Sequence, residues 1–166
     1  MRAFLSLLAI TGLTACATAY QPEGLSGGFT ETQLDKNVFR VSFQGNGYTR
    51  PERAEEMALL RSAELTLKNG FTHFAIVDGR SRTDYSAFTT PTQSRTTGTV
   101  SSFGNTSYLN AQTRTTGGQT FIAAKPSSTN TIICFTEKPE TGAFVYDAHF
   151  LFNSLGAKYG VTANAK

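Results

Sequence analysis

The predicted fold rests mainly on residues 38–79, VFRVSFQGNGYTRPERAEEMALLRSAELTLKNGFTHFAIVDG. Residues 38–43 are apolar or alternate with polar residues, which is typical of a half-buried strand, and Gly45-Asn46-Gly47 indicates a tight turn after it. Residues 71–78, centred on FAIV, predict a second strand. We expect this strand to end in a turn at Asp78-Gly79.

Between these two strands the sequence predicts a helix. Thr49 and Glu52 have the spacing of a capping box, in which the hydroxyl accepts a bond from a free backbone N–H at the helix start. Asn69-Gly70 indicates the end of the helix. Apolar residues at helical spacing form two strips, Met57, Leu60, Ala63 and Leu67 on one and Ala54, Ala58 and Leu65 on the other. Two strips indicate a helix that is buried over much of its surface.

The C-terminal part of the chain predicts a hairpin and a second helix. Residues 119–124 and 131–135 are expected as its strands, joined by a turn at residues 125–128. Asp147 is a suitable N-cap for an amphipathic helix that ends at Gly160. We therefore expect an α+β fold with one small mixed or antiparallel sheet of about four strands covered by two helices.

A Ser/Thr-rich insertion interrupts this pattern over residues 81–120, where 18 of 40 residues are Ser or Thr. Its charged residues are Arg82, Asp84, Arg95 and Arg114. Two similar pieces, residues 94–99 and 113–118, have the composition of hairpin arms, and Gly104-Asn105 between them favours a turn. A segment with so few large apolar residues is also typical of a disordered loop. The sequence leaves both interpretations open.

The N-terminus predicts a signal peptide over residues 1–15. Arg2 precedes an apolar run that is shorter than the roughly 20 residues needed to cross a bilayer. Leu13-Thr14-Ala15-Cys16 resembles the lipobox of bacterial lipoproteins, which implies lipid on the Cys16 thiol and cleavage before that residue. An ordinary secretory signal with an Ala-x-Ala-like cleavage site is the alternative interpretation.

The lipobox resemblance implies a protein held on a membrane by its N-terminal lipid. Residue 17 is Ala rather than Asp, which in such lipoproteins implies the outer membrane, here facing the periplasm. We expect residues 16–28 to be a lipidated tether, residues 29–160 to be a single domain and residues 161–166 to be a flexible C-terminus. The chain carries a formal charge of +3 with scattered Lys and Arg, so we expect no nucleic-acid partner.

The sequence contains no catalytic or metal-binding motif. Its two histidines, His73 and His149, do not have the spacing of a known nucleophile or zinc motif, and no cofactor or metal is expected. Cys134 lies in an alternating run and is predicted to be a buried, inert thiol. Glu64 falls on the apolar side of the first helix, so we expect an ion pair with Arg61 or Lys68.

Longer stretches resemble a group of small proteobacterial-type lipoproteins that have no established activity. The resemblance covers most of the chain outside the insertion and is carried by Tyr20-x-Pro22, by residues 27–34, 38–49, 53–55 and 59–67, by residues 69–74 and by Tyr146-Asp147-Ala148. It implies a location and lipidation, and it brings no catalytic residues to this chain.

Two classes of function follow from the sequence. The first is a non-enzymatic, structural or interaction protein of the cell envelope, whose insertion contacts another envelope protein or the cell-wall polymer through residues such as Phe103 and Tyr108. The second is a periplasmic small-ligand-binding or hydrolytic protein with a pocket between sheet and helices, for which Glu64, Asp78 and His149 are the candidates. The absence of a motif for the second class favours the first.

Overall fold

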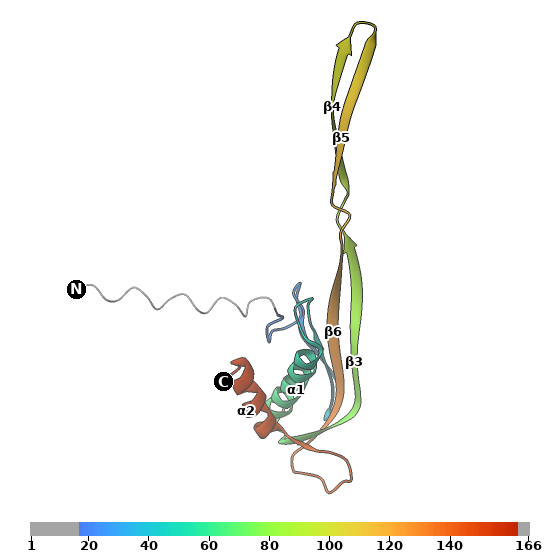
Figure 1. The fold of residues 1–166 in the computed structure, drawn as a ribbon. Coiled ribbons are helices and arrows are strands. Elements are labelled where there is room, and N and C mark those ends of the chain that lie inside the picture. Colours follow the sequence, from blue (N-terminus) through green and yellow to red (C-terminus); the bar gives the residue numbers. More distant parts are fainter. Residues whose placement is uncertain (1–16, 163–166) are drawn as a thin grey trace, which may run out of the picture. The chain divides into compact units, whose positions relative to one another are not determined.

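The computed structural model describes residues 17–162 (Figure 1). The predicted signal peptide with its lipobox, Cys16 and most of the predicted C-terminal segment therefore lie outside the described residues. Within residues 17–162 no helix is long and apolar enough to cross a membrane.

The described chain divides into two compact units. The first comprises residues 17–84 and 124–162, and the second comprises residues 85–123. Strands β3 (His73–Thr89) and β6 (Thr120–Phe135) each contribute residues to both units. Each unit is described by itself below.

A five-stranded sheet forms the framework of the first unit, and a separate two-stranded sheet forms the second. The strand order of the larger sheet is β1 (Gly28–Asp35), β2 (Val38–Gln44), β6, β3 and β7 (Tyr146–Asp147). Strand β2 pairs antiparallel with both β1 and β6, and β7 pairs antiparallel with β3. The two strands of the smaller sheet are β4 (Gln93–Phe103) and β5 (Thr106–Thr116). The α+β class is confirmed, whereas the expected number of about four strands is wrong.

Both helices lie on the same side of the five-stranded sheet (Figure 1). Helix α1 (Pro51–Lys68) packs on β2, and α2 (Ala148–Tyr159) packs against α1. The two strips predicted for α1 are buried or half-buried, as expected for a helix covered on more than one side. The fully buried side chains at the centre of this core include Val41, Phe43, Met57, Leu60, Phe74 and Ile132.

The predicted capping box of α1 is wrong. The N-cap is Arg50, which makes no side-chain cap, and Pro51 at the first helical turn supplies no N–H that would need one. The Thr49 hydroxyl instead accepts a bond from the Thr18 backbone N–H at 3.1 Å and another from Asn46 at 3.2 Å. The other predicted ends hold, since Asn69 caps α1 and the Asp147 carboxylate accepts the Phe150 N–H at 3.0 Å to start α2.

Two predicted turns are absent because strands run through them. Strand β3 continues past Asp78-Gly79 to Thr89. A Cβ atom at position 79 would make only ordinary van der Waals contacts with Ile76 and Asn130. Strand β6 continues through residues 125–128, where Ser127 and Ser128 pair with β2. The Pro126 carbonyl accepts the Gly45 N–H at 2.8 Å, so this proline joins the sheet through the bond it can still make.

The predicted tether at residues 16–28 packs on the first unit from Thr18 onward. The Thr18 side chain is buried and its hydroxyl donates to the Ser26 carbonyl at 2.8 Å. The Tyr20 ring packs against Phe29 in β1, with 4.9 Å between the ring centroids. Residues from Thr18 onward therefore pack on the first unit, and β1 is a strand that the sequence did not predict.

Candidate functional site

The Ser/Thr-rich insertion folds as a β-hairpin, which is one of the two interpretations that the sequence left open. Strands β4 and β5 pair antiparallel from Gln93↔Thr116 to Phe103↔Thr106 without a register shift. Gly104 has a φ of +61°, the left-handed conformation that a tight hairpin turn requires. The turn therefore falls at Gly104-Asn105, as the hairpin interpretation predicts.

Every side chain of β4 and β5 is exposed. Because side chains alternate along a strand, Phe103 and Tyr108 lie on one face of this hairpin, and the opposed pair Val100 and Leu109 lies on the other. The exposed fractions of Phe103 and Tyr108 are 88% and 65%. Apolar side chains on both faces are available to another molecule.

Hydroxyl pairs connect the two strands on the Val100 face. Ser94 lies 3.0 Å from Thr115, Thr96 lies 2.8 Å from Thr113, and Ser102 lies 2.9 Å from Ser107. Cross-strand pairs of this kind stabilise a sheet by only about 0.2–1 kcal/mol each. The hairpin is thus held by backbone pairing and hydroxyl contacts rather than by a core.

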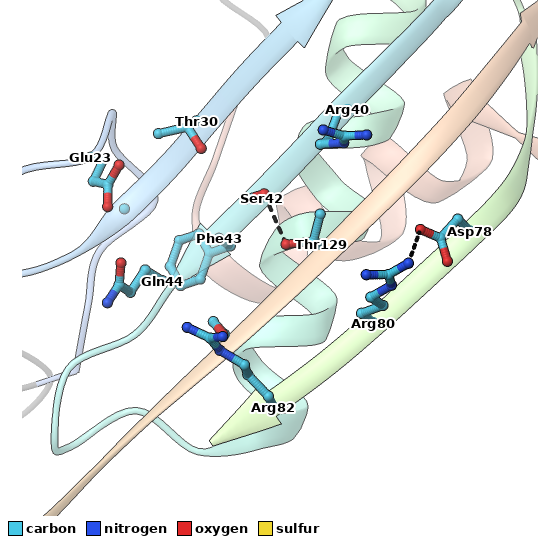
Figure 2. A pocket seen from close by; sticks show the side chains of 12 residues that line it. Glu23, Thr30, Arg40, Ser42, Phe43, Gln44, Asp78, Arg80, Arg82 and Thr129 are labelled. Atoms are coloured by element: carbon cyan, nitrogen blue, oxygen red, sulfur yellow. Dashed lines mark hydrogen bonds and ion pairs between the residues drawn. The ribbon is translucent and has the colours of Figure 1, made fainter. Parts of the chain in front are cut away.

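A second candidate surface lies on the face of the five-stranded sheet that the helices leave uncovered. A hollow of about 450 Å³ lies there. Figure 2 shows that hydroxyl, guanidinium and carboxylate side chains line it. The Ser42 and Thr129 hydroxyls are 2.9 Å apart, and Arg80 lies 3.4 Å from the Asp78 carboxylate. Among the three arginines of this hollow, Arg80 and Arg82 pair with Asp78 and Asp84, whereas Arg40 makes no ion pair within residues 17–162.

Glu64 does not line this hollow and belongs to a structural ion-pair cluster. Its carboxylate accepts from Arg61 at 2.6 Å and from the Tyr20 hydroxyl, and Arg61 also donates to Glu31 at 2.6 Å. Burial and the bond to Glu64 raise the pKa of Tyr20. Burial by itself would lower the pKa of Arg61, but the bonds to Glu31 and Glu64 outweigh it and raise the pKa. The predicted ion pair is confirmed, with Arg61 rather than Lys68 as the partner.

The three pocket candidates do not share one site. Asp78 lines the hollow on the uncovered face of the sheet, whereas His149 is exposed in the first turn of α2, and Glu64 is bound in its cluster on α1. The space between sheet and helices, where the sequence predicts a pocket, is filled by core side chains such as Val41 and Phe74. The structure therefore does not bring Glu64, Asp78 and His149 together, and the pocket between sheet and helices stays a prediction.

Cys134 is buried, as predicted, and burial raises the pKa of its thiol. A thiol with a raised pKa is a poor nucleophile at neutral pH. Among residues 17–162, no three His, Cys, Asp or Glu side chains are grouped so that they could hold a metal ion.

The arginines of the uncovered sheet face were missed in the sequence. Arg40 alternates with Phe39 and Val41, which signals that it points away from the core. Arg80 joins the same face only because β3 continues past Asp78. Comparison of the chain with protein families, with curated proteins and with solved structures finds no match.

Proposed function

We propose that this chain is a non-enzymatic lipoprotein of the cell envelope whose β4–β5 hairpin recognises another envelope component. The exposure of every side chain in β4 and β5 carries the proposal. A two-stranded hairpin without a core is only marginally stable in water, so its length adds little to the stability of the chain. A surface that a fold does not need for stability is typical of a binding element.

Two features of the hairpin suit protein recognition. Its aromatic side chains Phe103 and Tyr108 are the residue types that anchor interfaces, since they bury a large area at a low cost in conformational entropy. Between Tyr85 and Ala123 the chain has no acidic side chain and only two basic ones, so few charges need to be desolvated on docking. The partner class that fits is another envelope protein, with the cell-wall polymer as the alternative.

The location rests on the lipobox resemblance at Leu13-Thr14-Ala15-Cys16. Lipid on Cys16 would anchor the chain at the outer membrane, facing the periplasm, through buried methylenes worth about 0.8 kcal/mol each. Cys16→Ala is expected to release the protein from the membrane fraction and to stop incorporation of a palmitate analogue. An unchanged membrane fraction for Cys16→Ala would contradict lipid anchoring.

Photocrosslinking in cells tests the recognition role. A photoreactive amino acid replaces Phe103 or Tyr108 in the hairpin, and the matched control replaces Phe150 in α2, which is as exposed at 73%. We expect one discrete adduct from both hairpin positions and none from Phe150. Equal adducts from all three positions, or none from the hairpin, would contradict the proposal.

A small-ligand-binding or hydrolytic role has weaker support. Of its three candidate residues, Asp78 lines the hollow on the uncovered sheet face, and Glu64 and His149 do not. Arg40→Ala, on the uncovered sheet face, leaves the crosslinking pattern unchanged if the hairpin is the binding element.

A further inference from the structure

The two similar pieces of the insertion bring two arginines face to face. Antiparallel pairing of β4 with β5 sets Arg95 directly opposite Arg114. Side chains at such opposed positions have Cβ atoms about 4.5–5.5 Å apart, and like charges placed there destabilise the strand pair. Arg95 and Arg114 are the only charged residues between Tyr85 and Ala123, so no carboxylate within that unit neutralises them.

The neighbours of this arginine pair on the same face are hydrogen-bond donors. The flanking opposed pairs are Gln93↔Thr116 and Thr97↔Gln112, two positions before and after the arginines. All six side chains line one hollow of about 700 Å³ on the hairpin. These six side chains present two guanidinium groups, two amides and two hydroxyls, and no acidic side chain lines the hollow.

We infer that this hollow binds a phosphate monoester group through Arg95 and Arg114. A guanidinium group matches the geometry of a phosphate with two parallel N–H donors. A phosphate monoester carries about −1.5 to −2 charges at pH 7, which balances two guanidinium groups, whereas a carboxylate carries one. Bound phosphate would also remove the repulsion that the strand pairing creates. The inference rests on the proposed function, because it gives the chemistry of what the hairpin recognises.

Inorganic phosphate is the direct probe. The full chain carries ¹⁵N-labelled arginine, and phosphate is titrated at constant ionic strength while the arginine Nε–Hε resonances are followed. We expect saturable shifts at Arg95 and Arg114, and acetate is expected to bind at least about tenfold more weakly because it carries one charge. The absence of a saturable shift, or acetate binding as tight as phosphate binding, would overturn the inference.

Three variants distinguish phosphate binding at Arg95 and Arg114 from a non-specific effect of removing any positive charge. Arg95→Gln and Arg114→Gln are each expected to weaken phosphate binding by about tenfold or more, which corresponds to the loss of one charge-assisted pair. Arg82→Gln is the matched control, because Arg82 is an exposed arginine of the first unit that pairs with Asp84 at 3.0 Å. An equal loss of affinity in Arg82→Gln would overturn the inference. All three side chains are exposed, so the variants leave the core intact.

A second arm identifies the source of the phosphate. Phosphatidylcholine vesicles with and without phosphatidic acid are cosedimented with the wild-type chain and with the double variant Arg95→Gln/Arg114→Gln. Binding that needs both phosphatidic acid and the arginines assigns the phosphate to a lipid headgroup. Saturable binding of inorganic phosphate without vesicle binding assigns it to a soluble ligand. Crosslinks from Phe103 and Tyr108 without any phosphate binding would overturn this inference and leave the proposed function standing.

Discussion

The first unit and the hairpin of the second unit are stabilised in different ways. In the first, β2 presents Phe39, Val41 and Phe43 to α1, and burial of such apolar side chains contributes about 1.5–3 kcal/mol each. In the hairpin, β4 and β5 bury no side chain and are joined by hydroxyl pairs. The first unit is therefore held together by a buried core, whereas β4 and β5 expose every side chain to solvent.

Truncation of a core phenylalanine and of a hairpin phenylalanine should differ most in the free energy of unfolding. Phe43→Ala in β2 should lower the free energy of unfolding by about 3–5 kcal/mol, because it leaves a cavity in the core. Phe103→Ala should change it by less than about 0.5 kcal/mol, because that ring is 88% exposed. Urea denaturation followed by circular dichroism measures both. Similar losses for the two variants would contradict the comparison.

A smaller effect concerns the ion-pair cluster of the first unit. Arg61→Ala leaves the carboxylates of Glu31 and Glu64 without their cation. We expect the free energy of unfolding to fall by about 2 kcal/mol. This is less than for a fully buried pair, because both carboxylates are partly exposed. Arg114→Ala, in the hairpin, is the matched comparison and should leave the free energy of unfolding unchanged or slightly raised. A larger loss for Arg114→Ala would reverse the comparison.

The next effect appears at alkaline pH. Burial and the bond to Glu64 raise the folded-state pKa of Tyr20, so its stabilising contribution is complete below the unfolded value near 10 and is lost as pH rises through the folded-state pKa. The free energy of unfolding of the wild type should be lower at about pH 11 than at about pH 9, and Tyr20→Phe should reduce this slope with pH. Burial and a bond to Glu56 also raise the pKa of Tyr159, which accounts for part of the slope. An unchanged slope in Tyr20→Phe would contradict this account.

The smallest effect tests the hydroxyl contacts of the hairpin. Thr96→Val with Thr113→Val removes one cross-strand hydroxyl pair and should cost the hairpin about 0.5 kcal/mol or less. Amide hydrogen exchange, read separately for β4 and for α1, measures it. We expect faster exchange in β4 and not in α1, since β4 buries no side chain. Faster exchange in both elements would show that the two units are coupled.

The sequence predicts the parts of the fold that repeat a simple pattern. Helix α1, the Asp147 cap of α2 and the Glu64–Arg61 pair follow from helical spacing and from local hydrogen bonding. The lengths of β3 and β6 do not, because Gly79 and Pro126 signal turns locally while pairing with neighbouring strands keeps them extended. Tertiary pairing of this kind cannot be read from one segment.

The candidate site follows the same division. Phe103 and Tyr108 could be singled out because they are aromatic residues in a polar segment, and the hairpin turn at Gly104-Asn105 could be proposed. The arginine pair could not, since the alignment of Arg95 with Arg114 depends on a register that runs without a shift over the whole hairpin. The hollow on the uncovered face of the sheet could not be predicted either, because Arg80 joins that face only when β3 continues past Asp78.

Replacement of the second unit by a short turn tests whether the first unit folds without it. Ser81 contacts Ser128, and Thr89 contacts Thr120, so the same spacing places Asp84 opposite Lys125. A chain in which Asn-Gly replaces residues 85–124 therefore closes a two-residue turn at that point. We expect it to unfold in one cooperative transition, with a free energy within about 1 kcal/mol of the wild type. Loss of that transition would show that the hairpin is part of the folded body and would contradict the account.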